Sequence, residues 1–253
     1  MTTRSIVTKN DIVQGLRGLG TVPGDLLQVH SSMKSFGYVE GGPNTVIDAL
    51  LEVVGPEGTV MMSTFNHGAA EIFDIKMTPS RNGLLTETFR QRPQARRSMH
   101  PTHAYAAIGK LADWLTQGHL EAGTFGENCP LGKLAQKGGY CLMLGVAFNS
   151  CTAAHIGECK ARVHCIGWWQ GQGKIRLDDG GVVVVAKDVW RNGPCRIEWA
   201  PLEARMRARS LVRDTKIGDS HIMLFRTMDV INVTYEMTFE LCPDCPTMPR
   251  NDG

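Results

Sequence analysis

The apolar and polar positions in the first half of the chain predict helices and strands in alternation. Within residues 8–19, apolar residues recur at the spacing of an amphipathic helix, with Thr8 or Asn10 available as its N-cap. Short apolar runs typical of buried strands lie at residues 26–30, 58–64, 104–108 and 141–146. Further helices are expected at residues 44–54, 82–90, 111–116 and 131–136. Strand, helix and strand between residues 26 and 64 form a βαβ unit, so we expect these two strands to pair in parallel.

The second half of the chain changes character after residue 164. A strand at 174–177, the turn Gly180-Gly181 and the run VVVVA predict an antiparallel hairpin. Residues 201–212 predict a solvated helix, residues 218–225 a strand and residues 230–241 a mixed tail. We therefore expect a single domain over residues 1–253, α/β in class with an α+β C-terminal half. Its central sheet is expected to be mixed and flanked by helices, with antiparallel additions in the second half.

Composition excludes several classes of protein. The chain of 253 residues is 42% hydrophobic and 21% charged, as in ordinary globular proteins. A net charge of +2 gives no strong attraction to nucleic acid or to anionic membranes. No apolar run approaches the ~18 residues of a transmembrane helix, and the polar N-terminus lacks the apolar core of a signal peptide. A cytoplasmic monomer or homodimer is expected.

The eight cysteines are too few for a disulfide scaffold in a chain of this length. Cys242-Pro-Asp-Cys245 has the spacing of one half of a zinc knuckle. The other half would be a pair from Cys159, His164, Cys165 and Cys195, whose spacing matches no known pattern. The alternative is a surface turn near the chain end, with or without redox activity. We assign no metal ligand from these residues.

His155 is the first candidate for chemistry. The strand at 141–146 is followed by a turn, then by Thr152 as a potential N-cap and a helix beginning near Ala153. This order places His155 in the first helical turn beyond the carboxyl end of a strand, where open α/β sheets bind ligands. A histidine there suits general base catalysis, because its ordinary pKa of ~6.5 is close to neutral. The alternative is a histidine that only bonds locally.

The stretch from residue 30 to 42 is a second candidate. It begins with His30, Ser31 and Ser32 at the end of a strand, continues through glycines and leads into a helix. Glycines and hydroxyls before a helix suit a phosphate or an amide-rich chain. Neither glycine spacing of the known nucleotide motifs is present. A plain strand-to-helix turn explains the stretch nearly as well.

A basic segment precedes the strand at 104–108. Its arginine pair, Arg96 and Arg97, could hold a phosphate or could be a solvated turn. The His-x-x-His spacing of His100 and His103 suggests a metal, but the segment supplies no third ligand.

Four stretches occur here in the order and separation found in one known family. They are VHSSMKSFGYVEGG, GPEGTVM, ARRSMHPTHAYAAIG and LMLGVAFNSCTAAHIGE. Together they resemble the aminoglycoside 3-N-acetyltransferase family, over roughly residues 8 to 240. The resemblance is more specific in the first two-thirds of the chain than in the last. It implies an N-acetyltransferase that uses acetyl-coenzyme A.

The resemblance also implies roles for particular residues. His155 corresponds to the general base of the family, and a carboxylate some thirty positions later orients it. Asp188, just past the VVVVA strand, fits that offset best, and Glu198 is the reserve candidate. The residues implied in holding coenzyme A are His30, Ser31, Ser32, Ser35, Phe36, Gly37, Ser98 and His100.

The acceptor and two other functions stay open. The acceptor is an amine, of which the 3-amino group of an aminoglycoside is one candidate. Residues 66–81 are shorter and less acidic than the corresponding insertion of resistance enzymes, which weakens the case for a polycationic drug. One alternative is a non-catalytic or zinc-stabilised protein that binds coenzyme A or another ligand on the same scaffold. Another is a thiol enzyme using Cys151, although the expected cap at Thr152 places that thiol outside the helix.

Overall fold

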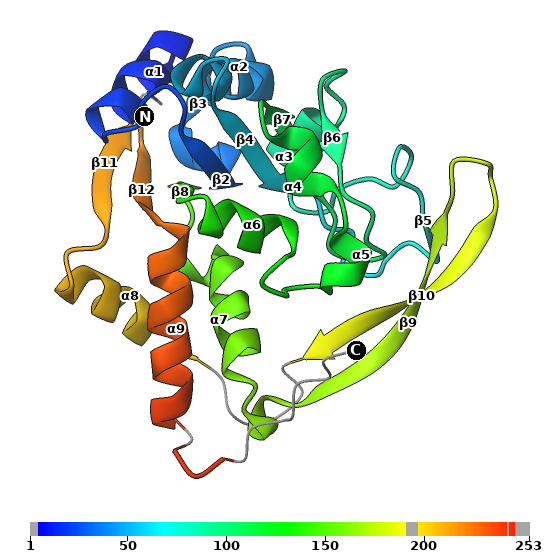
Figure 1. Cartoon of the computed structure of the whole chain (residues 1–253). Coiled ribbons are helices and arrows are strands. Elements are labelled where there is room, and N and C mark those ends of the chain that lie inside the picture. Colours follow the sequence, from blue (N-terminus) through cyan, green and yellow to red (C-terminus); the bar gives the residue numbers. More distant parts are fainter. Residues whose placement is uncertain (1–4, 191–196, 242, 246–253) are drawn as a thin grey trace.

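The computed structural model describes residues 5–190, 197–241 and 243–245, apart from the side chains of 168–169 and 188–190. Its centre is a mixed seven-stranded sheet in the order β11-β12-β8-β2-β4-β7-β6 (Figure 1). In that order, the strands are Arg213–Ile217, Ser220–Arg226, Tyr140–Leu144, Leu26–Ser31, Thr59–Ser63, Tyr105–Gly109 and Arg96–Arg97. β2 pairs in parallel with β4, as the βαβ pattern predicts, and also with β8, whereas the outer pairs are antiparallel. The predicted fold class, α/β with a mixed central sheet, is confirmed.

Alternating side chains of the central strands build a separate hydrophobic core on each face of the sheet. Leu142 and Leu144 of β8 face one core, whereas Cys141 and Met143 face the other. The first core is covered by α1 (Lys9–Gly18), α2 (Gly42–Val54) and α3 (Leu84–Arg90). The second is covered by α4 (Ala112–Thr116), α6 (Pro130–Gln136), α7 (Ala153–Ala161), α8 (Trp199–Ala208) and α9 (Thr227–Leu241). Burial on both faces explains why the central strands are continuous apolar runs.

The first helix follows directly from its sequence. α1 begins after Thr8, whose hydroxyl accepts from the Asp11 backbone N–H, and Asp11 accepts in return from the backbone N–H of Thr8. Its apolar stripe of Ile12, Val13 and Leu16 is buried against the sheet core.

The two strands that the sequence predicts as ligand-bearing lie side by side at the centre of the sheet. β2 and β8 are parallel, with Ser31 opposite Leu144, so both carboxyl ends reach the same edge. From β2 the chain enters a 3-10 helix, η1 (Met33–Phe36), and from β8 it enters η2 (Phe148–Ser150) and then α7. Gly145 ends β8 with φ of 66°, and a Cβ at this position would collide with the hydroxyl groups of Ser35 and Ser220. The two chain exits are therefore in direct contact.

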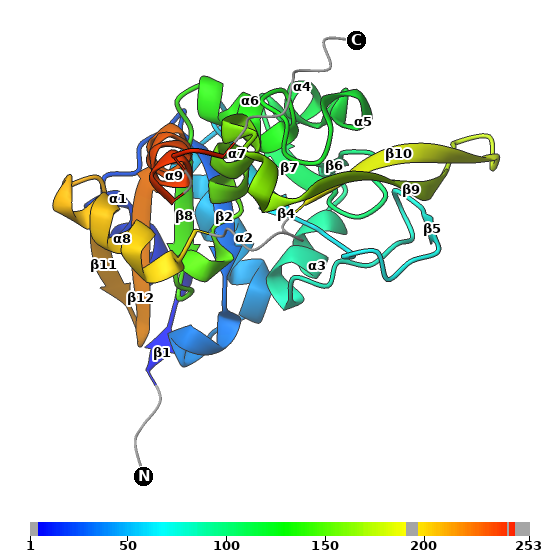
Figure 2. The same ribbon diagram turned by 90° about the horizontal axis from the view of Figure 1, so that it is seen from below.

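A long hairpin extends away from the main sheet (Figures 1 and 2). It consists of β9 (Trp168–Arg176) and β10 (Val182–Trp190), joined through the predicted Gly180-Gly181 turn. β5 (Ile72–Phe73) pairs in parallel with Lys174 and Ile175 of β9, so the loop at 66–81 supports the hairpin near its turn rather than at its base. The predicted antiparallel hairpin is present and is longer than its sequence signal.

A second small sheet joins β1 (Ile6–Val7) and β3 (Tyr38–Val39) in parallel. A short helix, α5 (His119–Ala122), lies between α4 and α6 along the chain. The remaining 3-10 helix is η3 (His164–Ile166).

Two elements at the C-terminal end differ from the sequence predictions. Residues 230–241 form most of α9 rather than a mixed tail, and β11 was not predicted. α9 contains β-branched residues of modest helix propensity, but packing against α7 and α8 overrides that preference. β11 is an edge strand whose sequence, RDTKI, is largely polar and gives no apolar signal. Across the described residues, no helix is both long enough and apolar enough to cross a bilayer.

The contact of α7 with α9 depends on Gly157. A Cβ at this position would collide with the backbone oxygen of Ile231. We expect Gly157→Ala to lower the free energy of unfolding by about 1–3 kcal/mol, because the helices must separate. Gly18→Ala is the matched control, since the space around Gly18 at the end of α1 is open and alanine favours helix. Urea titrations of both variants measure the difference, and equal stabilities would contradict the close packing.

Candidate active site

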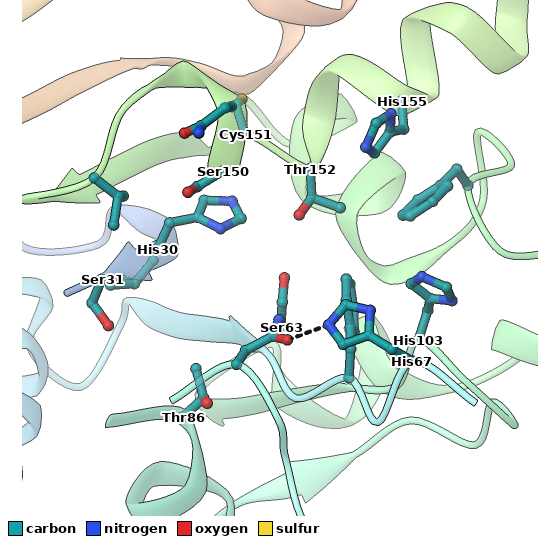
Figure 3. A pocket seen from close by; sticks show the side chains of 16 residues that line it. His30, Ser31, Ser63, His67, Thr86, His103, Ser150, Cys151, Thr152 and His155 are labelled. Atoms are coloured by element: carbon teal, nitrogen blue, oxygen red, sulfur yellow. Dashed lines mark hydrogen bonds between the residues drawn. The ribbon is translucent and has the colours of Figure 1, made fainter. Parts of the chain in front are cut away.

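A cavity of about 430 Å³ opens at the edge where β2 and β8 end (Figure 3). Its walls come from the ends of β2, β4 and β8, from the loop after β4, and from the start of α7. Its lining includes His30, Ser31, His67, His103, Phe125, Ser150, Cys151, Thr152 and His155. The structure therefore has a cavity at the edge of the sheet where the sequence predicts ligand binding.

His155 lies in the first turn of α7 and lines this cavity, as the strand–turn–helix pattern predicts. Its Nδ1 lies 2.8 Å from Oε2 of Glu158, whose side chain is only 1% exposed. The two residues are three positions apart on the helix, a spacing that brings side chains together on one face. A carboxylate on Nδ1 favours the tautomer with the proton on that nitrogen, so the lone pair of the neutral ring is on Nε2.

Aromatic side chains hold the His155 ring from two sides. The indole of Trp199 lies edge-on at 5.7 Å between ring centroids, and the ring of Phe125 lies at 5.4 Å. These ring contacts restrict rotation of the imidazole, and the Glu158 carboxylate against it is shielded from solvent. The imidazole is thus fixed in direction before any ligand binds.

Two more histidines form the opposite wall. His67 Nε2 lies 2.7 Å from Oδ1 of Asn82, and His103 Nδ1 lies 2.6 Å from the hydroxyl of Thr102. Their rings meet at right angles with centroids 5.7 Å apart. His67 has φ of 54°, a left-handed conformation that is uncommon for a residue with a side chain. Burial and the neighbouring histidines hold the pKa of His103 well below its ordinary value.

Behind this wall lies a buried polar network that contains Ser98 and His100. The Ser98 hydroxyl accepts from the Tyr105 backbone N–H and lies 2.9 Å from Nδ1 of His119. His100 stacks on His119 and accepts through Nδ1 from the backbone N–H of His103. Ser98 and His100 are 0% and 1% exposed, so in this structure they support the wall from behind. Burial lowers the pKa of His100 to about 2 and that of His119 to about 3.

The end of β2 and the turn that follows it contain residues that line the cavity and residues that lie inside the fold. His30 and Ser31 line the cavity, whereas Phe36 is fully buried in the core. The Ser35 hydroxyl donates to the Ser32 backbone oxygen and also contacts the hydroxyl of Ser220, both at 2.7 Å.

Gly37 is also internal to the fold. It packs against the Ser5 backbone and the Asp219 side chain, and its φ of 89° favours glycine. Of the residues implied for coenzyme A, the structure brings His30 and Ser31 to the cavity. Ser35, Phe36 and Gly37 shape the turn that holds them.

The arginine pair at residues 96–97 is divided between two roles. Arg97 donates to the backbone oxygens of Thr64 and Thr78, and burial lowers its pKa to about 10. Arg96 pairs with Asp113 at the surface. Both line a second, more open groove of about 750 Å³ on the β6 side of the molecule. Arg97 is therefore committed to internal bonds.

The two carboxylates expected to orient His155 lie on different elements. Asp188 falls inside β10, paired in register with Gln170, rather than just past the strand. Its side chain is outside the described part of the structure. Glu198 is exposed at the N-cap of α8, next to Trp199, which packs on the imidazole. The carboxylate found against Nδ1 is Glu158, which the sequence analysis missed. The His-x-x-Glu spacing within a predicted helix was the available signal.

Thr152 occupies the N-cap position before Ala153, as expected, but its side chain makes no capping hydrogen bond. Its hydroxyl side chain is part of the cavity lining. The predicted cap bond is therefore wrong, although the predicted start of the helix is right.

The structure describes six of the eight cysteines as thiols rather than disulfides, namely Cys129, Cys141, Cys151, Cys159, Cys165 and Cys245. Cys151 lines the cavity but is only 1% exposed and lies outside α7. The backbone N–H of Cys165 donates to Sγ of Cys245 at 3.2 Å, which brings these two segments together. Cys195 and Cys242 lie outside the described residues. Within the described ranges, no group of three or more His, Cys, Asp or Glu is arranged to hold a metal ion.

Comparison with known proteins identifies the class of protein and then its family. A family model described as aminoglycoside 3-N-acetyltransferase matches residues 28–238. Aminoglycoside N(3)-acetyltransferase III of Salmonella sp is 33% identical and aligns over 94% of this chain and 95% of its own. These matches define an acetyltransferase. The chain belongs to the aminoglycoside 3-N-acetyltransferase family, which confirms the resemblance seen in the four motifs.

Solved structures of the family share the fold. The aminoglycoside acetyltransferase AAC(3)-Xa is similar with a TM-score of 0.86 and 28% identity, over 95% of each chain. An alanine-for-histidine variant of AAC(3)-IVa, solved in complex with a gentamicin, is similar with a TM-score of 0.84 and 28% identity. That match covers 96% of this chain and 92% of the other.

The buried histidines predict a pH-dependent stability. Burial lowers the pKa values of His30, His100 and His119 to about 4, 2 and 3. Below the ordinary value of 6.5 the unfolded chain binds protons that the folded chain does not. The contribution of these rings to the free energy of unfolding is therefore fully present above pH 6.5. It is lost as the pH falls from 6.5 toward the pKa values of the folded state. At pH 5 each of these rings would remove about 2 kcal/mol of unfolding free energy.

Urea titrations at pH 7.5, 6.0 and 5.0 test this expectation. The unfolding free energy should fall by several kcal/mol with an unchanged denaturant slope. The exposed His164 provides a control, since His164→Gln should keep the same pH dependence. A stability that does not change between pH 7.5 and 5.0 would contradict the buried, neutral state of these rings.

Proposed function

We propose that the protein transfers the acetyl group of acetyl-coenzyme A to an amine, with His155 as the general base. The observation that carries the proposal is the pairing of His155 with a buried carboxylate in the wall of the cavity. Family membership supplies the reaction class, and the histidine–carboxylate pair supplies the group that such a reaction needs.

The reaction begins with a proton on the acceptor. An amine is mostly protonated near neutral pH, so it first releases one proton to solvent, and the free amine loses a second proton as it forms an amide. Nε2 of His155 accepts that proton, directly or through one water, as the nitrogen attacks the thioester carbon. The Glu158 carboxylate holds the Nδ1 proton and stabilises the imidazolium that forms. The intermediate then collapses to the amide, and the leaving thiolate takes the proton back from His155.

Polar groups at the ends of β2 and β8 suit acetyl-coenzyme A as co-substrate. Ser31, Ser150 and Thr152 offer hydroxyls beside the cavity, and the pantetheine arm is rich in amides that need such partners. His30 and Ser31 are the described members of the predicted coenzyme A set with access to this space. A direct transfer needs no acyl-enzyme, so Cys151 has no required chemical role.

An aminoglycoside is the first acceptor to test. A gentamicin is bound by the AAC(3)-IVa relative, and the family takes its description from such drugs. The net charge of +2, however, gives a polycation no overall attraction to this chain. The amine panel should therefore include monoamines beside gentamicin and sisomicin.

Replacement of the general base tests the function. His155→Ala should reduce thiol release from acetyl-coenzyme A by ~10²–10⁴-fold in the presence of the accepted amine. Binding of coenzyme A, measured by calorimetry, should change little because the imidazole acts on the acceptor. His164→Gln is the control and should retain wild-type turnover. Normal turnover by His155→Ala would refute the assignment, and absence of thiol release by the wild type with every amine would refute the function.

The orienting carboxylate has two candidates, and matched amide variants separate them. Glu158→Gln keeps the shape but loses the charge that fixes the Nδ1 proton, so kcat should fall by up to about 10⁴-fold with little change in KM. Asp188→Asn makes the same change at the position predicted from the family resemblance. We expect the larger loss in Glu158→Gln, and a second loss in Asp188→Asn if two carboxylates act on the imidazole. Loss confined to Asp188→Asn would show that Glu158 has no orienting role.

A further inference from the structure

His30 has a position that coenzyme A binding alone does not explain. It is the penultimate residue of β2 and lines the same cavity as His155. Figure 3 shows the two rings on different walls, with Ser150 and Thr152 between them. A reacting group between these walls would meet a base on one side and the His30 imidazole on the other.

The His30 ring has an unused hydrogen-bonding atom. The residue is only 8% exposed, and its Nε2 is buried without a hydrogen-bond partner among the described residues. A buried polar atom with no partner costs free energy, so most such atoms in folded proteins are paired. Its place in a cavity wall suggests that a ligand supplies the partner.

The charge of the ring determines which partner suits it. Burial lowers the pKa of His30 to about 4, so the ring is neutral at physiological pH. A neutral imidazole is a poor acid and carries one N–H donor. Neutral histidines are used in this way to polarise a carbonyl without giving up a proton. The ring therefore suits an oxygen that gains negative charge during the reaction.

We propose that the His30 imidazole N–H donates a hydrogen bond to the thioester oxygen of the acetyl group as that oxygen becomes an oxyanion. The proposal rests on the acetyl transfer proposed above. When the amine nitrogen attacks, the carbon–oxygen π electrons move to the oxygen, and the N–H of His30 stabilises the charge without transferring its proton. When the carbonyl reforms, the carbon–sulfur bond breaks and the thiolate leaves. His30 ends the cycle in its starting state.

The experiment compares three variants. His30→Leu removes the donor and keeps an apolar side chain, whereas His30→Asn and His30→Gln retain an amide N–H near the positions of Nδ1 and Nε2. We expect kcat of His30→Leu to fall by about 10²–10³-fold, as for loss of other oxyanion donors. One of the two amide variants places its N–H where the donating nitrogen of His30 lies. Its kcat should be at least about tenfold higher than that of His30→Leu. KM for acetyl-coenzyme A should stay within about threefold of wild type.

The pH profile separates His30 from the general base. Because His155 is intact, His30→Leu should lower the plateau of kcat without moving its acidic limb. His164→Gln serves as the control in this series also. Circular dichroism and coenzyme A calorimetry verify that each variant is folded and binds, and the amide variants carry the test if His30→Leu does not fold.

Two results would overturn the proposal. An unchanged kcat with a raised KM for acetyl-coenzyme A would make His30 a binding residue only. An unchanged kcat and KM would leave it without a role in the reaction. Failure of the wild type to release thiol with any amine is a different result, which refutes the proposed function itself.

Discussion

The parallel pairing of β2 with β8 is the constraint on which the site depends. Both strands are buried on each face, so their side chains have no freedom to change register without exposing a core. The fixed register brings the carboxyl ends of both strands to one edge of the sheet. β2 ends there with His30 and Ser31, and the segment after β8 leads to α7. Beyond the contact of Gly145 with Ser35, the chain leads from β2 to α2 on one face of the sheet and from β8 to α7 on the other, and the cavity lies where these paths separate.

Burial then determines the chemistry of the residues that surround this edge. Glu158 is enclosed by the core below α7, yet its carboxylate contacts an imidazole that faces the cavity. On the other side, His100, His103 and His119 are kept neutral by desolvation and by one another. The fold thus supplies one histidine with a carboxylate and surrounds it with histidines that do not compete for the proton.

Local sequence patterns were sufficient for the centre of the molecule and insufficient for its edges. Apolar runs identified β2, β4 and β8, and the order of strand, turn and helix placed His155 correctly. The sequence did not predict β11, because this edge strand is largely polar. It did not predict α9 as a helix, because packing outweighs the weak helix propensity of its residues. The resemblance assigns Ser98 and His100 to the binding of coenzyme A, whereas contacts with residues such as His119, some 20 positions away, bury both side chains. Such contacts cannot be read from local periodicity.

The meeting of Gly145 with the hydroxyls of Ser35 and Ser220 has an evolutionary consequence. Three segments distant in the sequence share one small volume, so none of them can accept a larger side chain there alone. A side chain at residue 145 would need smaller residues at both Ser35 and Ser220, and it would still be strained by the φ of 66°. The cavity can diversify through its outer loops, whereas this junction confines residue 145 to glycine.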